Sequence, residues 1–188
     1  AQYKETFYGL LARQALGLAP PPPPANSGGG EWQQLSRLPN VQVAAALTEI
    51  GEAELAGEVI RHQAAIGSAG DFPALTRLSA DLSLPETQLW LAHNGPVGAE
   101  PSVAARYPTP DWTPDGGWRV DKALVYAHTL QESRFRRDVV SPAGAYGLMQ
   151  IRPAAATDIA RNKGQADRTY DRTALTRPST NIEIGQSY

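Results

Sequence analysis

The residues of this sequence that could do chemistry gather between positions 123 and 151. Before Glu132, apolar residues recur at spacings of three and four: Val120, Ala123, Leu124, Ala127 and Leu130. This period predicts a helix that buries these residues, has Asp121 in its first turn and ends near Glu132. The negative end of the helix dipole and partial burial both favour a protonated carboxyl at such a position. A protonated carboxyl can act as a general acid.

A second group of candidate residues follows in the segment from Ser141 to Ile151. Gly144 and Gly147 lie three residues apart and indicate a tight backbone passage that tolerates no Cβ atom. Gln150 is the polar exception among the apolar residues that come next. A short loop with serine, glutamine and backbone amides beside a helix-end glutamate could form one wall of a sugar-binding cleft.

Three motifs occur in a fixed order along the second half of the chain. They are Glu132-Ser133-x-Phe135, then Ser141-x-x-Gly144-x-x-Gly147-Leu148-Met149-Gln150, then Asn181-Ile182-x-x-Gly185-x-x-Tyr188. In this order they resemble the catalytic domain of soluble lytic transglycosylases, lysozyme-like enzymes that cut bacterial peptidoglycan. The resemblance covers the last third to half of the chain. The helical segment before it is similar, more weakly, to the α-helical linker domain that precedes the catalytic domain in this family.

The resemblance implies a reaction that needs a single carboxyl group. Glu132 would protonate the glycosidic oxygen between N-acetylmuramic acid and N-acetylglucosamine. It would then accept the proton of the muramoyl 6-hydroxyl, which attacks its own anomeric carbon and gives a 1,6-anhydro product without water. Ser141, Tyr146, Met149 and Gln150 would bind the substrate. The implied partner is the peptidoglycan glycan strand, and the implied location is the periplasm or bacterial cell envelope.

Other interpretations of the same residues stay open. A muramidase would hydrolyse the same bond with water and ordinarily needs a second carboxyl, but Asp138, Asp158 and Glu183 belong to no matching motif. A non-catalytic scaffold or glycan-binding module could retain the motifs. Glu132 could also be a solvated acid paired with Arg136, since residues four apart are neighbours on a helix surface.

Composition excludes several classes of protein. The 188 residues carry a net charge of −2 with no basic run, which argues against nucleic-acid binding. No apolar stretch is long enough for a transmembrane helix, and the first residues lack the pattern of a signal peptide. The chain has no cysteine and only three scattered histidines, so we expect no metal site and no cofactor.

Periodicity and turn residues predict an all-α protein. Helices are expected at residues 3–18, 41–50, 52–66, 72–82, 85–93 and 153–160, with one turn at 171–175. Asp71 is expected to cap its helix, and Pro85 to lie in a first turn. Residues 1–100 are interpreted as a helical linker domain with a Pro/Gly-rich loop at 20–30. Residues 101–188 are interpreted as the amino-terminal part of a lysozyme-like domain.

The last helix is expected to be capped by Ser179, Thr180 and Asn181 and to reach Tyr188. The family that the chain resembles continues with further helices that close the cleft. We therefore expect a missing segment or a second chain to complete the catalytic domain, and this chain alone to be inactive without it.

Overall fold

The computed structural model describes residues 6–18, 30–97, 102–165 and 167–188. Helices dominate this part of the chain, apart from two isolated bridges that join Tyr146 to Val140 and Ile151. The α-helices are α1 (Phe7–Ala15), α2 (Gly30–Leu35), α3 (Pro39–Glu49), α4 (Ala53–Ile66), α5 (Phe72–Asp81), α6 (Pro85–His93), α7 (Val103–Arg106), α8 (Lys122–Ser133), α9 (Pro153–Asn162), α10 (Arg172–Thr176) and α11 (Pro178–Gly185). The predicted all-α fold class is confirmed.

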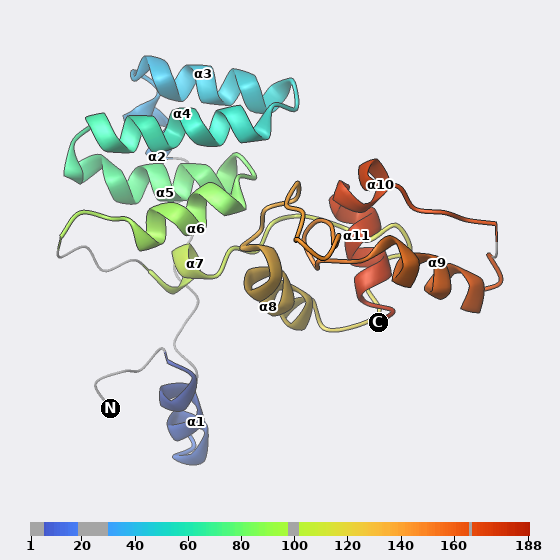
Figure 1. Cartoon of the computed structure of the whole chain (residues 1–188). Coiled ribbons are helices and arrows are strands. Elements are labelled where there is room, and N and C mark those ends of the chain that lie inside the picture. The colour runs from blue at the N-terminus through green and yellow to red at the C-terminus, as the bar shows by residue number, and fades with distance from the viewer. Residues whose placement is uncertain (1–5, 19–29, 98–101, 166) are drawn as a thin grey trace.

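Helices α3 to α6 stack side by side on one side of the molecule (Figure 1). One buried cluster joins these helices to α2 and to the turn before α6, and it contains Leu35, Val41, Ala44, Ala56, Ile60, Ala74, Leu75, Leu78, Leu84 and Leu91. Ala44 of α3 and Ala56 of α4 are completely buried, and their small side chains let the two helices approach closely. This stacked group lies within residues 1–100, and their assignment to a linker domain stays a prediction.

The helices of this group lie close to where the sequence pattern predicts them. Pro85 occupies the first turn of α6, as expected, and α4, α5 and α6 have nearly the predicted bounds. Asp71 is the N-cap residue of α5, as expected, but its side chain accepts no hydrogen bond from the helix. It also ends a short 3-10 turn, which the Ser68 hydroxyl caps. The short helices α2 and α7 were not predicted, and the loop predicted at 20–30 lies mostly outside the described residues.

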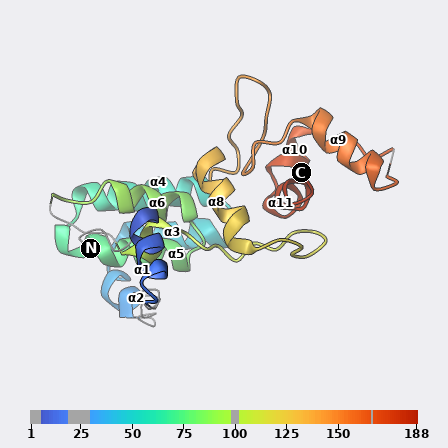
Figure 2. The same ribbon diagram turned by 90° about the horizontal axis from the view of Figure 1, so that it is seen from below.

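Helices α8 to α11 form the second group, and α8 lies between the α3–α6 stack and helices α9 to α11 in both ribbon views (Figures 1 and 2). Two buried clusters support them. One contains Leu89, Val125, Tyr126, Phe135, Leu148 and Ile182, with Trp112 and Trp118 packed against it. The other contains Ile151, Ala156, Leu175 and Ile184. Leu89 of α6 belongs to the first of these clusters, so the stack and the second group share apolar contacts.

Helix α8 turns a different face inward from the one predicted. Leu124 is 55% exposed and Val120 is 37% exposed, whereas Val125, Tyr126, Thr129 and Ser133 are buried. The reason is aromatic packing. The Tyr126 ring meets Trp118 edge to face with centroids 5.8 Å apart, and it meets Phe135 at 6.2 Å. These large rings bury more area than the alanines and leucines of the predicted face, and they set the rotation of the helix.

Helix α11 also differs from its prediction at the first turn. It begins at Pro178, and no side chain caps it. Thr180 and Asn181 lie inside the helix, where they are buried and bond to other segments. The Thr180 hydroxyl donates to Asp115 Oδ2 at 2.8 Å. Thr180 therefore ties the helix to the chain before α8, and Asn181 ties it to the loop after α8.

Candidate active site

The end of α8 positions Glu132. Asp121 caps the start of the helix by accepting a hydrogen bond from the Ala123 N–H at 2.7 Å. At the other end Arg134 and Phe135 have φ angles of 53° and 64°. Two consecutive left-handed residues without glycine are uncommon and stop the helix sharply. The turn sends Phe135 into the aromatic cluster and leaves Glu132 in the last helical turn.

Glu132 is exposed, and in the described part of the chain it makes no hydrogen bond and no ion pair. The partial burial expected for it is therefore wrong in this chain, because the rotation of α8 puts it on the solvent side. Arg136 does not pair with it. Instead the Arg136 Nε–H donates to the Ser133 carbonyl at 3.1 Å. The Glu132 carboxyl therefore has no side-chain partner in the described part of the chain.

The other carboxyls considered as partners are already paired. Asp138 binds Arg137 with 3.2 Å between Oδ2 and Nε, and Asp158 binds Arg161 at 2.9 Å. Glu183 lies in a larger network. Among the acids that could do glycosidic chemistry, Glu132 differs from these three in being free.

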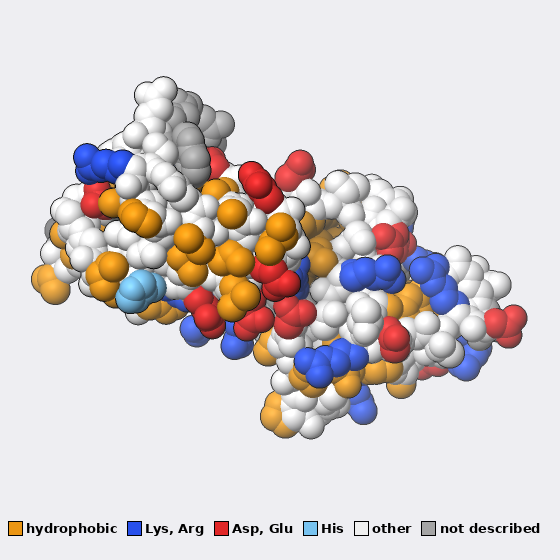
Figure 3. Space-filling view, turned by 90° about the horizontal axis from the view of Figure 1, so that it is seen from above, with side chains coloured by type: hydrophobic (Ala, Val, Ile, Leu, Met, Phe, Trp, Pro, Cys, Tyr) orange, Lys and Arg blue, Asp and Glu red, His pale blue; other side chains and the backbone are white. Residues whose placement is uncertain are grey.

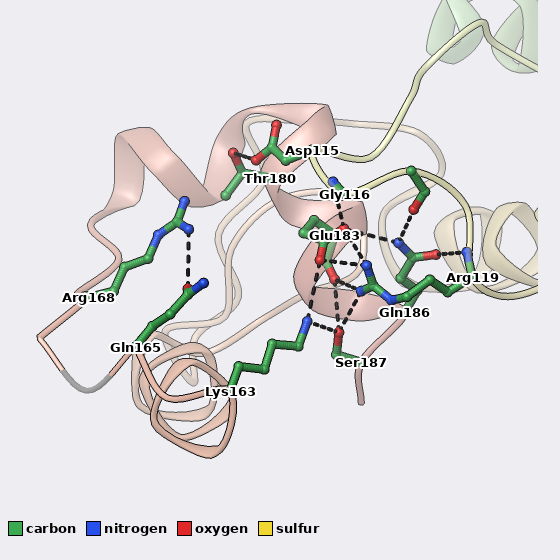
Figure 4. A network of polar contacts seen from close by, with 11 residues as sticks. Asp115, Gly116, Arg119, Lys163, Gln165, Arg168, Thr180, Glu183, Gln186 and Ser187 are labelled. Carbon is green, nitrogen blue, oxygen red and sulfur yellow. Dashed lines mark hydrogen bonds and ion pairs between the residues drawn. The ribbon is translucent and has the colours of Figure 1, made fainter.

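The network around Glu183 joins the chain before α8 to α9 and α11 (Figure 4). Its carboxylate accepts hydrogen bonds from Arg119 at 2.9 Å, from the Gly116 N–H at 3.0 Å and from Lys163 at 3.3 Å. Burial alone would raise the pKa of Glu183, but these hydrogen bonds outweigh it and hold that pKa below its ordinary value. Glu183 is consequently a charged carboxylate whose role is to hold these segments together.

Ser141 and Gln150 both bond within their own loop. The Ser141 hydroxyl accepts from the Ala145 N–H at 3.0 Å, which closes a tight turn. Gln150 has a φ of 48°, and its side-chain amide donates to the Gly147 carbonyl at 2.8 Å. Both side chains hold the loop in shape, and in the described residues neither makes a hydrogen bond to Glu132. Their roles in substrate binding stay predictions.

Tyr146 and Met149 are held by a residue whose role the sequence did not reveal, Asn181. Its amide oxygen accepts from the Met149 N–H at 2.8 Å, and its amide nitrogen donates to the Tyr146 carbonyl at 3.0 Å and the Leu175 carbonyl at 2.7 Å. Asn181 is completely buried. The sequence hint to this role was the place of Asn181 in the third motif, where its side chain bonds to backbone groups of other segments and does not cap the helix. The Tyr146 and Met149 side chains pack against the buried cluster around Leu175.

The loop and the end of α8 share one apolar support, because Phe135 and Leu148 belong to the same buried cluster. The end of α8 and this loop can together offer one free acid, Glu132, to an extended substrate. Within the described ranges no group of histidine and acidic side chains could hold a metal ion. None of the helices in these ranges is long and apolar enough to cross a membrane.

Residues 115–188 match the family model of the transglycosylase SLT domain. The membrane-bound lytic murein transglycosylase C of Salmonella typhimurium is 39% identical over 70 residues, which are 37% of this chain and 19% of that protein. The soluble lytic murein transglycosylase of the same organism is 39% identical over 72 residues, which are 38% of this chain and 11% of that protein. The chain thus spans less than a fifth of these relatives.

Solved structures share the fold over nearly the whole chain. The 70 kDa soluble lytic transglycosylase of Escherichia coli superposes with a TM-score of 0.71 at 23% identity, covering 100% of this chain and 31% of that one. An inactive glutamate-to-glutamine mutant of the lytic transglycosylase Slt of Pseudomonas aeruginosa gives 0.67 at 23% identity, covering 97% and 30%. The fold of both helical groups is therefore that of these proteins.

Proposed function

Residues 115–188 of this chain belong to the transglycosylase SLT domain family, and from that premise we propose that the chain is a peptidoglycan lytic transglycosylase, a lyase of the bacterial cell envelope. The observation that carries the proposal is the contrast among the acids. Glu132 is exposed and unpaired, whereas Asp138, Asp158 and Glu183 are each held by an arginine. Chemistry that needs two free carboxyls has no second candidate among these residues.

The single acid acts twice in the proposed reaction. Glu132 first donates its proton to the oxygen between N-acetylmuramic acid and N-acetylglucosamine, so that the glycosidic bond breaks. The resulting carboxylate then accepts the proton of the muramoyl 6-hydroxyl as that oxygen bonds to the anomeric carbon. The products are a free sugar hydroxyl and a 1,6-anhydromuramoyl end. Glu132 gives up one proton and takes one back, so it returns to its protonated starting state and no water is consumed.

Two further parts of the proposal concern the surroundings of Glu132. We propose that Ser141, Tyr146, Met149 and Gln150 contact the glycan strand. The loop that carries them is rigid because its own hydrogen bonds close it, and a preformed wall reduces the entropy lost on binding. The inactive glutamate-to-glutamine mutant of the Pseudomonas aeruginosa enzyme supports an essential glutamate in this fold.

The exposed apolar side of α8 supports a completing partner. Leu124 and Val120 are solvent-exposed at 55% and 37%, next to Ala123 and Ala127. We infer that a further segment of the same polypeptide, or a second chain, covers this side and desolvates Glu132. Burial would then favour the protonated carboxyl that the reaction needs.

Analysis of product ends after digestion of purified peptidoglycan tests the proposed function. The 1,6-anhydro ends that we expect resist borohydride reduction. Reducible muramic acid ends would instead show hydrolysis by a muramidase. Binding of the polymer without any soluble product would show a scaffold or glycan-binding module. The assay uses the chain together with whatever segment completes its domain, and a protein whose completed domain releases no anhydro ends contradicts the proposal.

A further inference from the structure

The connection that leaves the α3–α6 stack toward the second helical group begins with Asn94 and Gly95. Asn94 is the C-cap residue of α6, with φ −119° and ψ 27°, and both residues are exposed. Asparagine is one of the chemically labile residues of proteins. Its side-chain amide carbon can be attacked by the backbone nitrogen of the next residue, because the two atoms can close a five-membered ring. We therefore asked which groups of this pair are free to react.

The attacking nitrogen of this pair is available. Within the described residues the Gly95 N–H donates no hydrogen bond, and a residue without a Cβ atom can turn its backbone toward the Asn94 side chain at little cost. The Asn94 side chain is held by one contact, in which Nδ2 donates to the Trp90 carbonyl at 2.8 Å. That contact lies in the last turn of α6, where helices fray. The conformation needed for ring closure is therefore accessible.

A second acid–glycine pair, which could close the same ring, is blocked. Asp115 is followed by Gly116, but the Gly116 N–H donates to the Glu183 carboxylate at 3.0 Å, and Asp115 Oδ2 accepts from the Thr180 hydroxyl at 2.8 Å. Both reacting groups are thus occupied. The other asparagines in the described ranges are followed by larger residues, in the pairs Asn40-Val41, Asn162-Lys163 and Asn181-Ile182. Asn94 therefore differs from each of them in having a free glycine nitrogen beside it.

A carboxylate at position 94 would form in an unfavourable place. The carboxyl end of α6 is the negative end of its helix dipole, and acidic side chains outnumber basic ones in residues 30–97. Figure 3 shows acidic side chains along the edge of the stack that faces the second group. Helix α6 also links the two groups, because Leu89 packs in the cluster beneath α8 and Gln88 Nε2 donates to the Ala104 carbonyl at 2.8 Å. A new negative charge would loosen this end of the link.

We propose that Asn94 is a site of spontaneous deamidation, which adds a negative charge to the link between the two helical groups as the protein ages. The Gly95 nitrogen bonds to Asn94 Cγ and gives up its proton, the bond from Cγ to Nδ2 breaks, and ammonia leaves with that proton. Water then opens the five-membered imide at one of its two carbonyls. One opening gives aspartate, and the other gives isoaspartate, in which the main chain runs through the former side chain.

Incubation of the folded chain in mildly alkaline buffer, followed by peptide mapping with mass spectrometry, tests the reaction. We expect conversion of amide to acid at Asn94 at least tenfold faster than at Asn40, Asn162 or Asn181, with isoaspartate among the products. Gly95→Ala should slow it at least tenfold, and alanine fits there because Gly95 is not among the glycines with a left-handed φ. Conversion at Asn94 no faster than at Asn162, or aspartate as the only product, would overturn the proposal.

Two variants test the effect of the added charge. Asn94→Asp and Asn94→Ala both remove the donor to the Trp90 carbonyl, but only the first introduces a carboxylate. We expect a lower unfolding midpoint for Asn94→Asp than for Asn94→Ala, a difference that shrinks as salt screens the charge, and faster hydrogen exchange in the last turn of α6. A midpoint of Asn94→Asp equal to or above that of Asn94→Ala would overturn the proposed loosening of the link.

Discussion

Two glutamates in neighbouring parts of this molecule have opposite surroundings. Glu132, at the end of α8, is exposed and unbonded in the described chain. Glu183, in α11, accepts hydrogen bonds from Arg119, Lys163 and the Gly116 N–H. The carboxyl of Glu132 is thus free to transfer a proton, whereas that of Glu183 is occupied by hydrogen bonds that hold the fold. The difference teaches that partners, rather than residue type, decide which acid can act.

From this contrast we expect mutations in the two regions to change the free energy of unfolding by different amounts. Changes around α11 should lower the free energy of unfolding, because the polar groups there are hydrogen-bonded and two of them, Thr180 and Asn181, are buried. Changes on the open side of α8 should leave it nearly unchanged, because surface substitutions away from special features have small effects. Each variant below tests one side of the contrast.

Asn181→Ala should have the largest effect on stability. It removes three hydrogen bonds in a completely buried place and leaves the Met149 N–H without its acceptor. We expect a loss of about 4 kcal/mol in the free energy of unfolding, since each unsatisfied buried group costs about 1–3 kcal/mol. Chemical denaturation measures it. A loss below about 1 kcal/mol, typical of an exposed site, would show that Asn181 does not hold the loop.

Gly147→Ala should be nearly as damaging, and Gly144→Ala is its matched control. Both glycines have left-handed φ angles, 73° and 72°. A Cβ at Gly147 would lie 2.6 Å from Asn181 Nδ2 and against the Leu175 carbonyl, whereas a Cβ at Gly144 meets nothing within 4 Å. We expect about 1 kcal/mol for Gly144→Ala from backbone strain alone, and about 3 kcal/mol for Gly147→Ala once overpacking adds to it. Equal losses in thermal or denaturant unfolding would contradict the close approach.

Glu183→Gln should cost about 1.5 kcal/mol near neutral pH, a typical value for hydrogen bonds to a charged group. The cost should depend on pH. Because the pKa of Glu183 is lowered on folding, its stabilising contribution is present above the ordinary value of 4.5 and is lost as the pH falls through the folded pKa. The stability difference between parent and variant should therefore shrink in acid. A difference that stays constant down to pH values well below 4.5 would mean that the charge of Glu183 is not what stabilises the junction.

Leu124→Gln should have the smallest effect in the chain alone, within about 0.5 kcal/mol, because that side chain is 55% exposed. The same substitution should weaken the association of α8 with the segment proposed to cover it. Comparing unfolding of the isolated chain with that of the completed domain measures both. A loss of several kcal/mol already in the isolated chain would mean that Leu124 is packed after all.

The positions of most helices could be predicted from the sequence, because apolar periodicity and proline placement are local signals. Pro85 in the first turn of α6 is one example. The rotation of α8 could not be predicted. It depends on contacts of Tyr126 with Trp112 and Trp118, which lie in an irregular segment without apolar periodicity. Glu132 as the candidate acid followed from its motif. The role of Asn181 did not, since its bond to Met149 joins residues 32 positions apart.

The rates of peptidoglycan cleavage by Glu132→Gln and Glu183→Gln, each normalised to folded protein in the completed domain, test the central claim most directly. If Glu132 is the general acid, as proposed, Glu132→Gln should lower the rate by at least about 100-fold, with no change in the unfolding midpoint. Glu183→Gln should keep the parent rate per folded molecule despite its lower stability. If Glu132→Gln still releases anhydro products at the parent rate, the assignment of the acid is wrong.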